Sequence, residues 1–168
     1  MKPQGLRKLL TFIGVLMLTG YWLDGRSSGP ANESTAKRLA FRVTTMGEMI
    51  DRDGTQAGFH TAGSSDAHLG FTNFDASDGV KLIAMDGRFR SPEEAKRYLD
   101  WRVARASKIL TEGTKTDSKG KPVGYRAVLL LAPDHIESAV IWTSGPVFHQ
   151  IIAKSLPDAV ELERRYGQ

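Results

Sequence analysis

The strongest constraint on the fold is a complete helix signal in the second half of the chain. Ser91 can cap a helix, Pro92 suits a first turn, and Glu94 stands where a capping box needs an acid. This pattern predicts one long amphipathic helix over residues 92–110, with Gly113 available to end it. Small and apolar residues recur every three or four positions along it, at Ala95, Leu99, Val103, Ala106 and Leu110.

Apolar runs on both sides of this helix predict strands. Ser155, Pro157 and Asp158 then open a short final helix. Because short connections between successive strands force antiparallel neighbours, the expected fold class is α+β. We expect a small, mostly antiparallel sheet with one long and one short helix packed on one or both of its faces. The predicted strands are Leu39–Met46, Val80–Met85, Val123–Ala132 and Ser138–Thr143.

Three further segments have weaker patterns. Residues 147–153 can form either a helix or the second strand of a hairpin, and the turn residues at 144–146 favour the hairpin. Residues 51–79 are rich in glycine and read as a long loop that is either functional or hides a short strand around residues 68–73. Residues 114–122 read as a basic loop.

The first 31 residues have the pattern of a targeting segment. Three basic residues precede an uncharged, apolar run at 9–23, and a small, polar stretch follows it. These are the three parts of a secretory signal peptide, with candidate cleavage positions after Gly29 or Ala31. We expect residues 1–31 to form the targeting segment with its linker, and residues 32–168 to form a single α+β domain.

An uncleaved membrane anchor through residues 9–23 is the alternative. Tyr21 and Trp22 stand where an interfacial aromatic belt would lie. A helix of this length would reach about 22 Å, short of the roughly 30 Å of a bilayer core. Both alternatives place the rest of the chain outside the cytoplasm, as a periplasmic or secreted protein or as a domain held at the cytoplasmic membrane.

The charge distribution argues against a nucleic-acid partner. The formal net charge is +4, but four basic residues and one acidic residue lie among the first 31. The remaining 19 basic and 18 acidic residues leave a net charge of only +1. Most of the basic excess therefore belongs to the targeting pattern and not to a nucleic-acid surface. The absence of cysteine excludes disulfides, thiol nucleophiles and cysteine-bound zinc.

Histidines and acids within 51–79 form a candidate metal site. His60, His68 and Asp75 supply the imidazole and carboxylate ligands that zinc or another divalent ion accepts. Their spacing matches no known metal motif, and aspartate with glycine is also the ordinary composition of solvated loops. No cofactor is otherwise expected, because phosphate-loop, dinucleotide and nucleophile-elbow motifs are absent.

Other candidate binding residues lie near the predicted helix and in the basic loop. Trp101 with Arg97 and Arg105 could form a cation–π or partner-binding surface, unless Trp101 simply packs on a neighbouring loop. Lys119 and Lys121 could receive an anionic ligand. Candidate acid–base groups are His149, Asp134 and Glu137, which the sequence alone does not bring together.

These observations lead to two expectations about function. The first is an exported or membrane-anchored, non-catalytic binding module of the cell envelope, whose partner is another protein or an envelope component. The second is a small-molecule or metal-binding protein, or a hydrolase, that uses the His- and Asp-containing loop 51–79.

Overall fold

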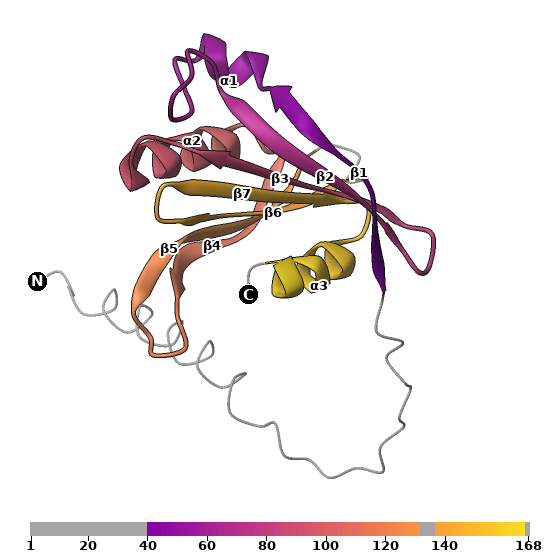
Figure 1. Ribbon diagram of the computed structural model, residues 1–168. Helices are drawn as coiled ribbons and strands as arrows, with labels where there is room; N and C mark the ends of the chain where they lie inside the picture. The colour runs from indigo at the N-terminus through magenta and orange to yellow at the C-terminus, as the bar shows by residue number, and fades with distance from the viewer. Residues whose placement is uncertain (1–39, 132–136, 167–168) are drawn as a thin grey trace, which may run out of the picture. The chain divides into compact units, whose positions relative to one another are not determined.

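The computed structural model describes residues 40–131 and 137–166, and residues Leu39–Gln168 form one compact unit (Figure 1). An antiparallel sheet of seven strands carries three helices, which establishes the α+β class. The elements in chain order are β1 (Phe41–Ile50), α1 (Arg52–Gln56), β2 (His68–Ala76), β3 (Lys81–Arg88), α2 (Pro92–Ala104), β4 (Lys108–Thr116), β5 (Pro122–Leu130), β6 (Ser138–Ser144), β7 (Val147–Ala153) and α3 (Leu156–Tyr166).

The sheet consists of two meanders joined in the middle. Its strand order is β1-β2-β3-β7-β6-β5-β4, and every neighbouring pair is antiparallel. β1, β2 and β3 are neighbours in the order of the chain, with only the short α1 between the first two, and β4, β5, β6 and β7 follow one another directly. The pairing of β3 with β7 joins the two groups, and α2 carries the chain from β3 to the far edge strand β4.

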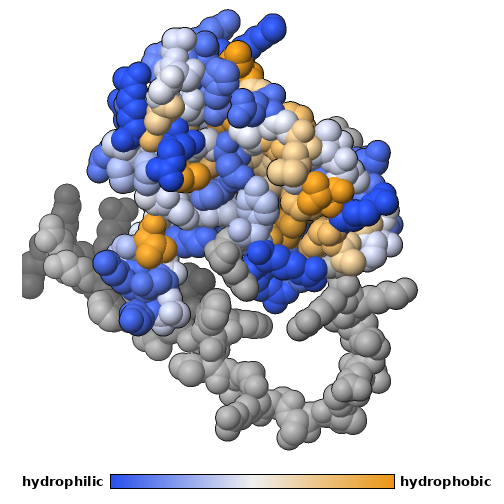
Figure 2. All heavy atoms as spheres, in the orientation of Figure 1, coloured by the Kyte–Doolittle hydropathy of each residue, from blue (hydrophilic) through white to orange (hydrophobic). Residues whose placement is uncertain are grey.

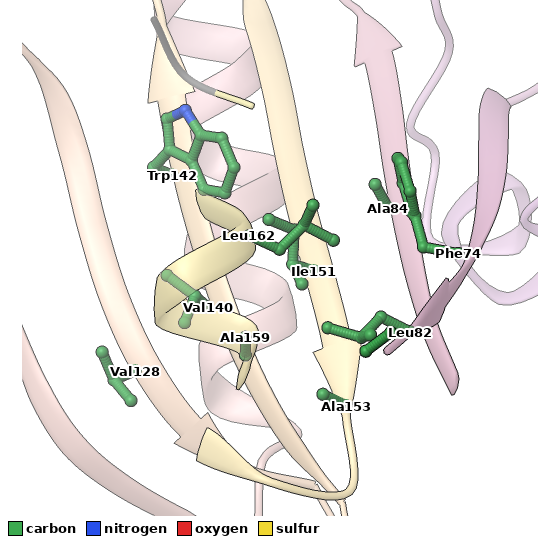
Figure 3. Close-up of a cluster of buried hydrophobic side chains, with 11 residues drawn as sticks. Phe74, Leu82, Ala84, Val128, Val140, Trp142, Ile151, Ala153, Ala159 and Leu162 are labelled. Carbon is green, nitrogen blue, oxygen red and sulfur yellow. The ribbon is translucent and has the colours of Figure 1, made fainter. Parts of the chain in front are cut away.

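The two longer helices cover opposite faces of the sheet (Figure 1). On the first face, Tyr98 and Leu99 of α2 pack against Ile141 and Phe148. On the second face, Leu162 of α3 covers a cluster that includes Trp142 and Ile151 (Figure 3). Because side chains alternate along a strand, both faces of the central strands are buried and hydrophobic.

Helix α2 begins where the sequence predicts and ends earlier. Ser91 is its N-cap and accepts a hydrogen bond from the backbone N–H of Glu94, while Glu94 accepts one from the backbone N–H of Arg90. The predicted helix 92–110 is wrong at its C-terminal end, because α2 ends at Ala104. Residues from Lys108 onward leave the helix and pair with β5 as an edge strand.

The two predicted loops contain regular structure. Within 51–79 the chain forms α1, capped by the carboxylate of Asp51, and then the long strand β2, which includes the expected strand at 68–73. The basic loop predicted at 114–122 contains the last residues of β4 and a tight turn around Gly120. At 147–153 the favoured hairpin strand is confirmed as β7.

Strand β1 leaves one edge of the sheet exposed. Nine of its ten residues are exposed, and four of these are the large hydrophobic residues Val43, Met46, Met49 and Ile50. Figure 2 shows hydrophobic residues gathered on the flank where β1 lies, beside a hydrophilic rim. An edge strand presents unpaired backbone groups, so this flank is the least covered part of the sheet.

The predicted signal or anchor at residues 1–31 lies outside the described residues. Among residues 40–131 and 137–166, no helix has the length and hydrophobicity needed to cross a membrane.

The close approach of β5 to β6 provides a test of the fold. A methyl group added at Gly124 would lie 1.9 Å from the backbone oxygen of Thr143, whereas one added at Gly113 meets nothing within 4 Å. We expect Gly124→Ala to lower the free energy of unfolding by about 3 kcal/mol, because backbone atoms must move apart. Gly113→Ala is the control and should be neutral or slightly stabilising. Urea unfolding of both variants checks this, and equal effects would contradict the described β5–β6 geometry.

Candidate functional site

One lateral row of residues crosses all seven strands, and its central members contact the last turns of α3. It lies two residues along each strand from the hydrophobic row that contains Ala84, Val140 and Ile151, so it faces the same side of the sheet as α3. Unlike that hydrophobic row, it is largely polar and aromatic. In strand order from β1 to β4, its members are Glu48, Gly70, Asp86, His149, Trp142, Arg126 and Gly113.

Asp86 is the centre of the candidate site. Its Oδ1 lies 2.5 Å from Nδ1 of His149 on the neighbouring strand β7. Its Oδ2 accepts a hydrogen bond of 2.5 Å from the hydroxyl of Tyr166, at the C-terminal end of α3. The side chains of Asp86 and His149 keep 33% and 19% of their surface exposed, so a ligand can reach both. We call Asp86, His149, Trp142 and Tyr166 the Asp86 cluster.

Trp142 fixes the plane of the His149 ring. The two rings stack at a centroid distance of 4.9 Å with an interplanar angle of 14°. Trp142 itself is 1% exposed, so it supports the imidazole from the core and offers little surface to a ligand. The ammonium of Lys115 on β4 lies 4.9 Å from the centroid of the same indole, a cation–π distance.

The surroundings of the cluster shift two pKa values. Burial raises the pKa of the Tyr166 phenol to about 12, and its hydrogen bond to Asp86 and the negative charge of Asp86 add to this shift, while a hydrogen bond with Thr72 opposes it. Burial also lowers the pKa of the Lys115 ammonium, against the opposite effect of the nearby Glu163 carboxylate. Shifted titratable groups close together are a property of functional sites as well as of structural ion pairs.

An ion pair holds α3 over this end of the sheet. Arg126 of β5 donates two hydrogen bonds to Glu163 of α3, from Nε at 2.7 Å and from Nη2 at 2.6 Å. The hydrogen bonds to Glu163 raise the pKa of the Arg126 guanidinium. This bidentate contact and the bond between Tyr166 and Asp86 fix the last turns of α3, which form one wall of the candidate site.

The geometry leaves one imidazole nitrogen for a ligand. When Nδ1–H of His149 donates to Asp86, the neutral ring presents Nε2 as an acceptor. Among the described residues, none forms a hydrogen bond with this nitrogen. The cluster can therefore accept a hydrogen bond at Nε2 and at the exposed carboxylate of Asp86, and it can transfer a proton through the oriented ring.

The three predicted metal ligands do not lie together, which corrects that prediction. His68 and Asp75 lie seven residues apart on β2, so they are about 23 Å apart and on opposite faces. Asp75 instead lies 3.6 Å from the guanidinium of Arg42, and His60 lies between α1 and β2. Within residues 40–131 and 137–166, no group of three or more histidine, aspartate and glutamate side chains is placed to hold a metal ion.

The five predicted binding residues lie in three places. Trp101 and Arg105 are together at the end of α2, where the Arg105 guanidinium lies 4.9 Å from the indole centroid. This Trp101 packs against Phe59 of the neighbouring loop, at a ring distance of 5.5 Å. Arg97 lines a groove near the start of α2, and Lys119 and Lys121 are exposed in the β4–β5 turn.

We compared the chain with family models, with curated proteins and with solved structures, and it matches none of them. Of the predicted acid–base groups, His149 belongs to the Asp86 cluster, Glu137 is exposed, and Asp134 lies outside the described residues.

Sequence reasoning missed Asp86 and Tyr166. The sequence does contain a signal for Asp86. Every second side chain of β3 faces the core, and Asp86 continues the series that begins with Leu82 and Ala84. His149 likewise lies on the same side of β7 as the core residues Ile151 and Ala153. Each of the two strands therefore carries one polar residue among its core-facing positions. If two such strands pair, the two polar side chains are expected to meet.

A second polar network lies on the opposite face and has a structural role. The buried carboxylate of Asp51 accepts hydrogen bonds from the Tyr98 hydroxyl and from the backbone N–H of Gly54. Arg102 lies 3.7 Å from the same carboxylate and donates to Gln150 at 2.9 Å. Burial raises the pKa of the Tyr98 phenol. These contacts attach α1 to α2 and to the centre of the sheet.

The pKa of Tyr166 yields a test of the cluster. A phenol whose pKa is raised in the folded state stabilises that state fully below the ordinary pKa of about 10. This contribution is lost as the pH rises through the folded value of about 12. We expect Tyr166→Phe to remove one phenolate transition in this pH range, which ultraviolet absorbance measures. The variant should also lose less stability than the unmodified chain as the pH rises through this range. An unchanged high-pH transition in the variant would contradict the raised pKa of Tyr166 in the folded state.

Proposed function

We propose that this chain is an exported, non-catalytic binding module that takes a hydroxyl-rich envelope ligand at the Asp86 cluster. The observation that carries the proposal is the oriented and part-exposed imidazole of His149 beside a part-exposed carboxylate. A side chain that is fixed before binding loses little conformational entropy when a ligand arrives. Such preorganisation is what a recognition site requires.

The available hydrogen-bonding groups indicate the class of ligand. A carboxylate has about four acceptor positions, and Asp86 uses two of them for His149 and Tyr166. His149 adds the acceptor Nε2, and Lys115, at the indole of Trp142, is a donor close to the cluster. Hydroxyl groups both donate and accept hydrogen bonds, so a saccharide or another polyhydroxylated molecule matches this mixed set.

Acid–base hydrolysis at the same cluster is the second candidate function. The contact between Asp86 and His149 favours it, because a carboxylate that orients an imidazole is the arrangement of a general base. A nucleophile would also be required, and within the described part of the chain no serine or threonine hydroxyl bonds to the His149 ring. Binding therefore has more support than catalysis.

The proposal of export rests on residues 1–31. A basic start, an uncharged apolar run at 9–23 and a small, polar exit support a signal peptide or an anchor. The near-neutral composition of the rest of the chain also fits a module whose excess of positive charge lies in its targeting segment.

Export is tested by expressing the full chain in a secreting bacterial host. We expect the protein outside the cytoplasm, with an intact mass reduced by the residues up to Gly29 or Ala31. Full-length protein in the membrane fraction would instead support the anchor through residues 9–23. Full-length protein in the soluble cytoplasmic fraction would contradict both forms of the proposal.

Ligand binding is tested with two neutral oligosaccharides, chitotetraose and cellotetraose, titrated into the isotope-labelled full chain. We expect shifts in the NMR signals of His149 and its neighbours on β3 and β7. His149→Phe keeps a ring on Trp142 but removes both nitrogens, and should weaken binding by about tenfold or more. Asp86→Asn should act in the same direction, because it removes the charge that strengthens hydrogen bonds from the ligand.

Glu112→Ala on β4 is the matched control, since this exposed residue lies outside the row. Neither saccharide producing shifts at the cluster, or equal binding by His149→Phe and Glu112→Ala, would contradict the proposal. Release of shorter saccharides by the unmodified chain, lost in both His149→Phe and Asp86→Asn, would favour the hydrolase instead.

A further inference from the structure

The face of the sheet opposite the Asp86 cluster carries a groove between α2 and β5. It has a volume of about 530 Å³, within the usual range for ligand sites. We call it the α2–β5 groove. Its walls include Pro92, Lys96, Arg97, Val123, Tyr125 and Thr143.

The groove lies where the regular backbone pairing of β5 with β6 ends. The β5–β6 pairing ends at Arg126 and Trp142. Beyond that pair, the side-chain hydroxyl of Thr143 accepts the hydrogen bond from the Tyr125 N–H. The β4–β5 hairpin then bends away from the side on which α2 lies (Figure 1). The first turn of α2 and the first residues of β5 are left as two walls with open space between them.

One wall is hydrophobic and aromatic. Val123 is 38% exposed although it is a large aliphatic residue, and Tyr125 beside it is half-buried. The ammonium of Lys96 lies 4.1 Å from the centroid of the Tyr125 ring and bonds to Asp100 on the outer side of α2. Lys96 is therefore held in place as part of the wall.

Arg97 is the second cation that lines the groove, and it is weakly neutralised. Arg97 is 69% exposed, and its nearest carboxylate, Glu94, lies 4.0 Å away. Lys121 stands two residues before Val123, within about 7 Å along the chain, and Lys119 is in the same turn. Within residues 40–131 and 137–166, neither lysine forms an ion pair.

One carboxylate faces these cations. Glu93 lines the groove, and a hydrogen bond with the Ser91 side chain lowers its pKa, so it stays charged near neutral pH. Lys96 and Arg97 nevertheless outnumber Glu93 in the lining, and the exposed Lys121 stands two residues from Val123 in the chain. A hydrophobic wall with a positive rim complements an extended chain that carries both carboxylates and apolar side chains.

We propose that the α2–β5 groove binds an extended acidic peptide segment of a partner protein. Acidic side chains contact Arg97 and the lysines of the β4–β5 turn, and an apolar side chain between them packs on Val123 and Tyr125. This site is separate from the Asp86 cluster and does not depend on the saccharide proposal.

The probe is a fluorescently labelled octapeptide in which glutamate alternates with leucine, and its matched control has glutamine in place of glutamate. We expect the glutamate peptide to bind the full chain about tenfold more tightly than the glutamine peptide, with an affinity that falls as salt is added. Fluorescence anisotropy measures both, in the presence and absence of inorganic phosphate.

Two variants separate the groove from general attraction between charges. Val123→Trp fills the groove without changing the charge and should weaken the glutamate peptide about tenfold. Arg97→Ala should weaken it about threefold, because an exposed ion pair contributes little energy. Lys108→Ala removes an exposed charge at the start of β4 and should have no effect, and His149→Phe should also have none.

Equal binding of the two peptides, or no effect of Val123→Trp when its unfolding transition is unchanged, would overturn the proposal. Complete displacement of the peptide by millimolar phosphate would overturn it as well, because the groove would then be a site for small anions. Loss of binding in Val123→Trp, with Lys108→Ala unaffected, supports a peptide site.

Discussion

The pairing of β3 with β7 is the interaction on which the rest of the structure depends. It joins residues 82–88 to residues 147–153, at the boundary between the two meanders. On one face it places Leu82 and Ala84 beside Ile151 and Ala153, which completes the layer under α3. The same pairing brings Asp86 to His149 across a sequence separation of 63 residues. Contacts so distant along the chain cost more loop-closure entropy than contacts within a hairpin.

The parts of the fold that could be predicted are those set by neighbouring residues. The start of α2 depends on Ser91, Pro92 and Glu94, which lie within four positions, and it was predicted correctly. Its end was not, because Ala106 and Leu110 continue the helical spacing by coincidence. Lys108 and the residues after it gain backbone hydrogen bonds from β5 instead, and no short window of sequence contains both strands. The strand at 68–73 was only one of two alternatives for the glycine-rich stretch 51–79, because its pairing partners β1 and β3 lie outside that stretch.

The candidate site was harder to predict than the fold. His149 was recognised as a titratable group, but its partner could be named only once the register of β3 against β7 was known. The predicted metal site was wrong for the opposite reason, because residues that are close in sequence were expected to be close in space. His68 and Asp75 are close in sequence, yet the extended backbone of β2 carries them apart, whereas a flexible loop could have brought them together.

A β-bulge in β1 changes which of its side chains face α3. The register of β1 against β2 shifts between Val43 and Thr45, so Thr44 is an extra residue. Before the bulge, odd-numbered residues such as Phe41 and Val43 face α3; after it, Met46 and Glu48 take that side. Odd-numbered residues therefore face α3 in the first segment of β1, and even-numbered residues face it in the second. This lets Phe41 join the core while Gly47 lies under the ring of Phe71 on the other face, where any larger residue would collide with it. One additional residue thereby reconciles two packing requirements that a regular strand could not meet together.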